Sequence, residues 1–194
     1  MTADLFGEAL VPGLGYCPDF IDATEERELV EQLSGVNLSP FRFHGWIGKR
    51  KTHSFGWRYD FDDASFAPSE PLPDWLHPLR AKAAAFAGVE PDAFVHALLT
   101  HYEPGAGIGW HRDRTVFDKV VGVSLQAPAV LRFRQRTDDG FRRIALPVEP
   151  RSAYLLTGDA RHEWEHSIAP RAELRFSITL RTLSDLGRRK AAAL

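Results

Sequence analysis

A His-x-Asp pair and one distant histidine are the residues of this sequence that could bind a metal ion. His111 and Asp113 are two residues apart, and in an extended segment that spacing places both side chains on one face. His166 lies on the segment that leads into the last apolar run. Two histidines and a carboxylate form the facial triad of non-haem iron oxygenases, which leaves three coordination sites open. The tripeptide alone also fits a surface histidine beside a turn aspartate, so the triad depends on His166.

The segment 175–181 alternates strictly between polar and apolar residues. Its polar positions share one face of the predicted strand and its apolar positions share the other. The polar positions are Arg175, Ser177, Thr179 and Arg181. A polar strand face can simply be solvated. If this face lines a barrel, its buried arginines need anions, and arginine binds a carboxylate bidentately. A dicarboxylate cosubstrate beside iron would meet that need.

The segment His162-Glu-Trp-Glu-His166 also matches the pattern of zinc metallopeptidases, in which two histidines one helical turn apart bind zinc. That motif needs both histidines on one face of a long helix. Gly158 precedes the segment and Pro170 follows it, so only a short helix fits. A zinc hydrolase built on His162 and His166 therefore stays an alternative interpretation.

Taken together, these motifs resemble the AlkB-type branch of the Fe(II)/2-oxoglutarate dioxygenases over residues 94–183. Shorter matching phrases lie before the metal pair and between it and the arginine motif. They are Tyr102-x-Pro-Gly, Val123-Ser-Leu125, Phe133-Arg134, Ala160-Arg161 and His166-Ser-Ile168. The resemblance implies a mainly β (α+β) fold with a double-stranded β-helix (jelly-roll) core, N-terminal helices and a hairpin that covers the substrate.

The resemblance also implies a set of catalytic and binding residues. His111, Asp113 and His166 would bind Fe(II), and Tyr102 and Arg175 would hold the far carboxylate of 2-oxoglutarate. The other cosubstrate-binding positions would be Arg181, beside Asp113 and the near carboxylate, together with Thr100 and Ser177. Nucleic-acid demethylases usually have asparagine at these last two positions, but both hydroxyls can still form hydrogen bonds. The implied reaction consumes O2 and 2-oxoglutarate and oxidises an N-methyl group, which leaves as formaldehyde.

One position departs from the DNA-repair members of that family. They usually carry an acidic residue two positions after the metal aspartate, where it helps to read the methylated base. This chain has Arg114 and Thr115 after Asp113. Oxidation of alkylated nucleic-acid bases, as in DNA repair, is our main hypothesis. The alternatives are the same chemistry on RNA or tRNA, on a protein side chain or on a small molecule, and a non-catalytic jelly-roll binding module.

A stretch rich in aromatic and basic residues is the candidate substrate-binding region. Residues 41–47 and 52–61 predict a hairpin whose turn is the basic segment 48–51. The rings of Trp46, Trp57 and Tyr59 could stack on an unpaired base, with Trp57 expected nearest the metal. Alternatively, they pack the hairpin onto the barrel. The turn would then present Lys49, Arg50 and Lys51 to phosphates.

The remaining elements follow from capping and periodicity. A capping box at Asp22 predicts a helix that ends at Gly35, and a second helix spans about 74–86. Residues 62–73 predict a loop, and the tail from 187 is expected to fray. Short strands are predicted over 94–102, 119–126, 129–136, 141–148, 152–156 and 174–182. Within these strands, Arg132, Arg134, Arg136, Arg142 and Arg143 predict a solvated basic face.

The length of 194 residues predicts a single domain, and the resemblance implies that it is one dioxygenase domain over 1–194. Residues 1–90 would form the helices and the covering hairpin, 91–183 the jelly roll and 184–194 the tail. Hydrophobic residues make up 44% of the chain, which is ordinary for a globular protein. A single cysteine, Cys17, excludes an intramolecular disulfide. An acidic N-terminus and the lack of a long apolar run predict a cytoplasmic protein that does not bind membranes, and we expect it to be a monomer. The net charge of −2 requires any nucleic-acid partner to bind a local basic patch.

Overall fold

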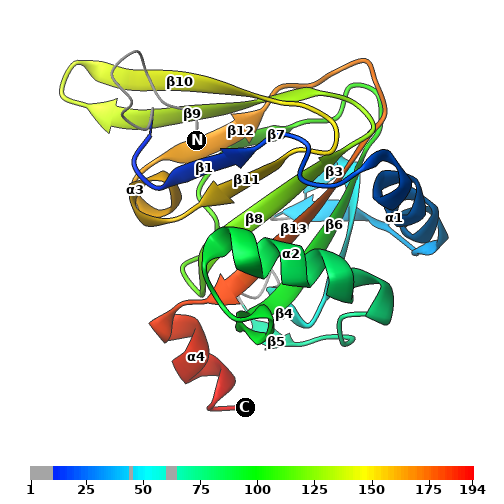
Figure 1. Ribbon diagram of the computed structural model, residues 1–194. Helices are drawn as coiled ribbons and strands as arrows, with labels where there is room; N and C mark the ends of the chain where they lie inside the picture. Colours follow the sequence, from blue (N-terminus) through cyan, green and yellow to red (C-terminus); the bar gives the residue numbers. More distant parts are fainter. Residues whose placement is uncertain (1–10, 44–45, 60–64) are drawn as a thin grey trace.

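The computed structural model describes residues 11–43, 46–59 and 65–194. Its largest element is a seven-stranded antiparallel sheet, shown in Figure 1. The strand order is β1-β11-β8-β13-β6-β3-β2. The bounds are β1 Leu14–Cys17, β2 Ser39–Phe43, β3 Trp46–Phe55, β6 Phe94–Tyr102, β8 Phe117–Leu125, β11 Ala153–Leu156 and β13 Arg175–Leu183. Strands from both ends of the chain thus share one sheet.

A four-stranded sheet packs face to face with the large one. Its strand order is β10-β9-β12-β7, with bounds β7 Ile108–His111, β9 Ala129–Thr137, β10 Gly140–Val148 and β12 Glu165–Ile168. Buried side chains from both sheets, including Leu131, Phe133, Leu156 and Trp164, form the core between them. This arrangement confirms the predicted mainly β jelly roll.

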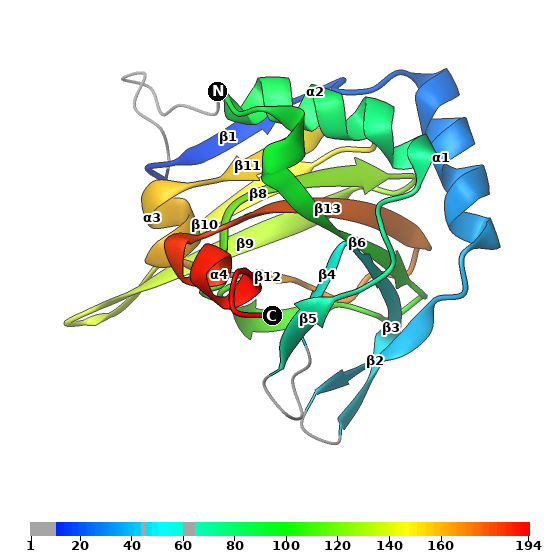
Figure 2. The ribbon, with the colours of Figure 1, turned by 90° about the horizontal axis from the view of Figure 1, so that it is seen from below.

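Two helices cover the other face of the large sheet, as Figure 2 shows. The first is α1 (Ala23–Gly35). The predicted capping box is present, because the side chains of Asp22 and Glu25 each accept a hydrogen bond from the backbone N–H of the other residue. The second is α2 (His77–Ala87), preceded by the 3-10 turn η1 (Asp74–Leu76). It ends at Gly88, whose φ of 61° is left-handed. Both helices pack on the apolar positions of β6, β8 and β13.

Alternation explains why β13 can serve both sides of the large sheet. Phe176, Ile178 and Leu180 pack toward the two helices. The polar positions from Arg175 to Arg181 face the space between the sheets and are nevertheless buried. The solvated interpretation of this face is therefore wrong, because the small sheet covers it.

The structure corrects three local predictions. Segment 48–51 lies inside β3 and is not a turn, because β2 and β3 pair on either side of residues 44–45, which lie outside the described residues. The predicted loop 62–73 contains a short strand, β5 (Phe66–Pro68), paired with β4 (Trp57–Tyr59). The tail forms α4 (Asp185–Ala191), capped by Ser184 and packed through Gly187 against Val116.

The remaining elements are short. They are η2 (Pro91–Ala93) and α3 (Gly158–His162). None of the described helices is both long and apolar enough to cross a membrane.

Candidate metal and cosubstrate site

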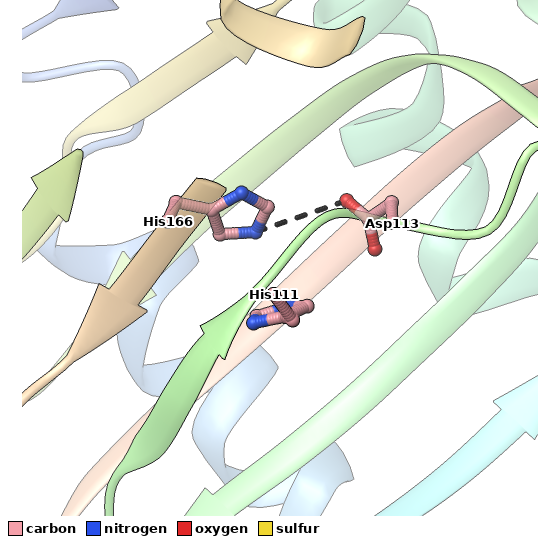
Figure 3. A group of neighbouring side chains, drawn as sticks. All are labelled: His111, Asp113 and His166. Carbon is pink, nitrogen blue, oxygen red and sulfur yellow. Dashed lines mark ion pairs between the residues drawn. The ribbon is translucent and has the colours of Figure 1, made fainter. Parts of the chain in front are cut away.

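Three side chains from neighbouring segments converge between the two sheets, as Figure 3 shows. His111 ends β7 and is the register partner of His166 on β12. Asp113 follows two residues after His111, beyond the end of β7. One ligand atom from each residue lies within 4.8 Å of the others. The His166 Nε2 atom is 3.9 Å from Asp113 Oδ2. Two imidazoles and one carboxylate on a single side suit a divalent transition metal with open positions.

Charge and hydrogen bonding hold these groups in the forms that bind metals. Burial alone would raise the pKa of Asp113, but Arg181 at 2.8 Å and the two nearby imidazoles hold it well below its usual value. Burial, with a smaller contribution from His111, lowers the pKa of His166 to about 3. The ring of His111 donates from Nδ1 to the Gly109 carbonyl at 2.9 Å, which leaves Nε2 free as a ligand atom.

The three residues face a cavity of about 480 Å³. Its wall includes aromatic, hydroxyl and basic side chains from both sheets. They include Phe41, Arg50, Tyr59, His96, Thr100, Tyr102, Trp110, Tyr154 and Arg181. A cavity of this size can enclose a small ligand. The metal-ligand candidates therefore lie at a site where a ligand can reach them.

The far end of the β6–β13 pair presents an arginine that fits a carboxylate. Arg175 is the register partner of Tyr102 and lies over its ring at 4.9 Å. Its Nε and Nη2 atoms donate to Ser124 Oγ at 3.2 and 3.1 Å. Its buried Nη1 atom has no hydrogen-bond partner among the described residues. An unpaired buried guanidinium nitrogen is costly, so an anionic ligand here would satisfy it.

The other expected cosubstrate residues lie between Arg175 and the metal-ligand candidates. Thr100 and Ser177 are register partners across β6 and β13, and both are buried. Arg181 also has a buried atom, Nε, without a partner among the described residues. The donor set of two histidines and one aspartate, together with these arginine nitrogens, fits Fe(II) and a dicarboxylate.

Two residues that the sequence did not single out complete the inner wall. Tyr154 on β11 is the register partner of Gly122 on β8. A Cβ atom at position 122 would overlap its ring and hydroxyl, so the phenol lies across the glycine. Burial raises the pKa of Tyr154 to about 12, which keeps its hydroxyl a hydrogen-bond donor. No local pattern reveals this residue, because it depends on the pairing of two distant strands.

His96 is the second such residue. Its Nδ1 atom lies 3.4 Å from Arg181 Nη1, and its ring packs on Phe117. Burial lowers the pKa of His96 well below its ordinary value, so the neutral ring can accept from the guanidinium. The contact helps to direct Arg181 toward Asp113.

The structure distributes the predicted substrate-binding residues differently from expectation. Tyr59 and Arg50 line the cavity, and Arg50 stacks on Phe41 at 3.7 Å. Lys51 forms an ion pair with Glu103 at 2.6 Å on the opposite face of β3. Lys49 is exposed on that same face. The three basic residues cannot act as one phosphate-binding turn, because neighbouring positions of a strand point in opposite directions.

The aromatic residues divide in the same way. Trp57 is absent from the described lining of the cavity. It stacks on Phe66 at 4.7 Å in a small separate core, so the packing interpretation holds for this ring. The side chain of Trp46 lies outside the described residues. Trp110, which precedes His111, lines the cavity instead.

The His-Glu-x-x-His interpretation is not supported by the geometry. The helix α3 ends at His162, and His166 lies on β12. His162 faces Asp118 at 3.3 Å, whereas His166 faces Asp113. The two histidines therefore do not share the helix face that a zinc peptidase site requires.

Comparison with known proteins agrees with this geometry. A family model described as the 2OG-Fe(II) oxygenase superfamily matches residues 13–181. The chain is 28% identical over 173 residues to the mouse (Mus musculus) protein named tRNA (carboxymethyluridine(34)-5-O)-methyltransferase ALKBH8, covering 84% of this chain and 25% of that protein. It is 33% identical over 110 residues to alpha-ketoglutarate-dependent dioxygenase AlkB of Escherichia coli (strain K12), covering 53% of this chain and 48% of AlkB.

The chain thus spans about a quarter of the mouse relative and about half of AlkB. A solved structure titled "The structure of OsALKBH1" shares the fold with a TM-score of 0.70 at 16% identity. The match covers 90% of this chain and 99% of that one. Because the likeness extends over nearly the whole chain, the strands that carry the triad and the arginines belong to a shared architecture.

Proposed function

The chain belongs to the 2OG-Fe(II) oxygenase superfamily, and we propose that it is an AlkB-type dioxygenase that removes N-methyl groups from nucleic-acid bases. The observation that carries the proposal is the convergence of His111, Asp113 and His166 on one side of an accessible cavity. AlkB itself is named a dioxygenase dependent on alpha-ketoglutarate, which is 2-oxoglutarate. The methyltransferase activity in the mouse relative's name is not carried over, because the chain spans only a quarter of that protein.

In this proposal the chain binds its cofactors through two groups of residues. His111, Asp113 and His166 would hold Fe(II). Arg175, with the Tyr102 hydroxyl, would bind the far carboxylate of 2-oxoglutarate, and Arg181 would lie beside the near one. Thr100 and Ser177 would provide hydroxyls along the path between them. The residues of the chain hold these ligands in place and keep the cavity shaped and dry.

Fe(II) and 2-oxoglutarate supply oxygen-dependent oxidation, with conversion of 2-oxoglutarate to succinate and CO2. Each turnover would consume one O2, with one oxygen atom ending in succinate and the other in a hydroxymethyl group on the base nitrogen. Breaking of its C–N bond would release formaldehyde, and the hydroxyl proton would pass to the base nitrogen or, for a cationic base, to water. Tyr59 on the cavity wall would contact the target base, and Trp110 at the mouth of the cavity would contact a neighbouring base, since aromatic rings stack on any base.

Single-stranded or looped nucleic acid suits this cavity better than an intact duplex. A base must leave its stack to reach a metal between two sheets, and unstacking costs a few kcal/mol. RNA is a second candidate, supported by Thr115 at the position of the base-reading acid and by the tRNA in the mouse relative's name. DNA repair, or modification of an RNA, would be the corresponding process.

The test measures formaldehyde and succinate together. The protein is incubated with Fe(II), 2-oxoglutarate and N-methylated single-stranded DNA, single-stranded RNA, duplex DNA or a methylated peptide. We expect equal amounts of both products from a single-stranded oligonucleotide and none from Asp113→Ala. Turnover of the peptide alone would assign a protein substrate, and the absence of both products with every substrate would contradict the proposal.

A further inference from the structure

The outer face of the four-stranded sheet carries a row of arginines. Along β9, Leu131 and Phe133 point into the core between the sheets, so Arg132, Arg134 and Arg136 lie on the outer face. We call this surface the arginine face, and define it by Trp110, Arg112, Arg132, Arg134, Arg136, Phe141 and Arg143. Figure 1 shows β9 and β10 forming the long hairpin at the edge of the molecule.

Two of these arginines face each other across neighbouring strands, which is unfavourable because their charges repel. Arg134 and Arg143 are register partners across β9 and β10, and like charges directly opposite each other destabilise a sheet. The ring of Phe141 contacts both guanidinium groups, at 4.7 and 5.3 Å. Glu165 pairs with Arg134 at 2.6 Å. Among the described residues no carboxylate forms an ion pair with Arg143, so an anionic ligand would relieve the repulsion between the two arginines.

The other arginines of the arginine face also lie beside an aromatic ring or are exposed. Arg132 and Arg134 lie over the ring of Trp110, at 5.2 and 4.6 Å. Arg112 and Arg136 are exposed. Of the five arginines of this face, Arg112, Arg134 and Arg136 lie around the two acidic residues Glu163 and Glu165. Two further acidic residues, Asp138 and Asp139, lie beyond Arg136 in the turn between β9 and β10.

The arginine face is continuous with the mouth of the active-site cavity. Trp110 and Arg112 flank His111 and line the cavity. Arg112 also lines a shallow depression of about 280 Å³ with Arg134, Arg136, Phe141 and the acidic residues Glu163 and Glu165. A single-stranded nucleic acid with one base in the cavity would therefore place the neighbouring phosphates beside these guanidinium groups.

We propose that the arginine face binds the phosphodiester backbone of a single-stranded nucleic acid whose target base occupies the cavity. This inference rests on the proposed function and assigns its phosphate-binding surface. The guanidinium groups contact phosphates as charge-assisted, bidentate donors. The guanidinium groups and the rings of Trp110 and Phe141 beneath them also offer a platform for unpaired bases. The surface replaces segment 48–51, whose basic side chains point to opposite faces of β3.

The test compares binding of a labelled single-stranded oligonucleotide at several salt concentrations, by fluorescence anisotropy. The variant is Arg136→Ala/Arg143→Ala, two exposed positions on the hairpin away from the metal-ligand candidates. The control is Arg189→Ala/Lys190→Ala on α4, which removes the same charge from another exposed surface. Each lost phosphate contact lowers the slope of log affinity against log salt by about 0.7. We expect the slope to fall by about 1.4 in the variant and to stay unchanged in the control.

Further measurements separate this inference from the proposed function. Arg136→Lys/Arg143→Lys should keep the salt slope, because the charge remains. Oxidation of a free N-methylated nucleoside should be equal in wild type and variant, because neither arginine lines the cavity. If no substrate is oxidised but oligonucleotide binding shows the expected slopes, the proposed function fails and the binding surface stands.

Three outcomes would overturn the inference. The first is a wild-type protein that does not bind the oligonucleotide. The second is an alanine variant with an unchanged slope, or a control that loses as much. The third is an acidic peptide that binds more tightly than the oligonucleotide with the same dependence on Arg136 and Arg143, which would assign the surface to a protein partner.

Discussion

At the scale of single residues, Asp113 connects the metal site to the cosubstrate site. Its Oδ1 atom accepts from Arg181 at 2.8 Å, while Oδ2 faces His166. The guanidinium keeps the buried carboxylate ionised, and it also fixes the direction in which Oδ2 points. Removing either partner would leave the other charge buried and unpaired, which is strongly destabilising.

The two histidines of the His-Glu-x-x-His segment should differ sharply in their effect on metal binding. His166→Ala should weaken Mn(II) binding by at least about a hundredfold, since even loss of a residue behind a ligand costs 10–100-fold. His162→Ala should leave the affinity unchanged, because His162 faces Asp118. Calorimetric titration of both variants with Mn(II) measures this difference. An equal loss of affinity in both variants would restore the zinc-hydrolase interpretation, in which both histidines are ligands.

Arg175 should control the cosubstrate and not the metal. Arg175→Ala should raise the 2-oxoglutarate concentration needed for half-maximal turnover by more than about a hundredfold, because loss of one partner of a buried ion pair costs 3–5 kcal/mol. Mn(II) affinity should not change. Arg175→Lys should recover only part of the loss, since lysine lacks the bidentate fork. Unchanged dependence on 2-oxoglutarate in Arg175→Ala would exclude this role.

At the scale of elements, pairing between distant strands shapes the inner wall of the cavity. Gly122 sits in the middle of β8, between Thr179 on β13 and Tyr154 on β11. The missing side chain at 122 leaves the space that the Tyr154 phenol occupies. The strand β8 thus shapes the cavity wall through the missing side chain of Gly122, whereas β6 and β13 provide its polar side chains.

Gly122→Ala should therefore destabilise the protein. Overpacking a filled interior costs about 1–3 kcal/mol, and the neighbour here is a buried ring. The measurement is urea unfolding of the variant against wild type. Gly109→Ala is the matched control, because a Cβ there meets no atom within 4 Å among the described residues. The control should stay within about 0.5 kcal/mol of wild type. Equal stability of both variants would show that the Tyr154 ring can move away.

At the scale of the whole molecule, the site joins the two sheets. His111 and His166 belong to the small sheet, while Arg175, Arg181 and Tyr102 belong to the large one. Of the metal-ligand candidates, Asp113 already bridges the sheets through Arg181. A metal and a dicarboxylate bound together would add further links across the same interface.

Ligand binding should accordingly raise the melting temperature in two separable steps. A ligand at a hundred times its Kd stabilises the folded state by about 2.7 kcal/mol. Calorimetric melting should show one increment with Mn(II) and a second when 2-oxoglutarate is added. The Arg175→Ala variant should keep the first increment and lose the second, and a chelator should remove both. A full second increment in that variant would place the cosubstrate elsewhere.

The sequence by itself determined the elements and the chemistry that local patterns specify. The capping box predicted α1, and two-residue alternation predicted the strands and the division of β13 into an apolar and a polar face. His111, Asp113 and Arg175-x5-Arg181 were identifiable because their spacings lie within one strand or its extension. These features depend on residues that are close in the chain, where the backbone periodicity fixes the direction of each side chain.

Only the tertiary structure decided which of those faces were covered and which distant residues met. The arginines of β13 are buried because the small sheet packs over them, and Tyr154 enters the cavity because β11 pairs with Gly122. The pairing of β2 with β3 set the direction of segment 48–51, sending Arg50 into the cavity and Lys51 to Glu103. Strand register and sheet stacking arise from contacts between residues far apart in the chain, and a one-residue shift would reverse every face.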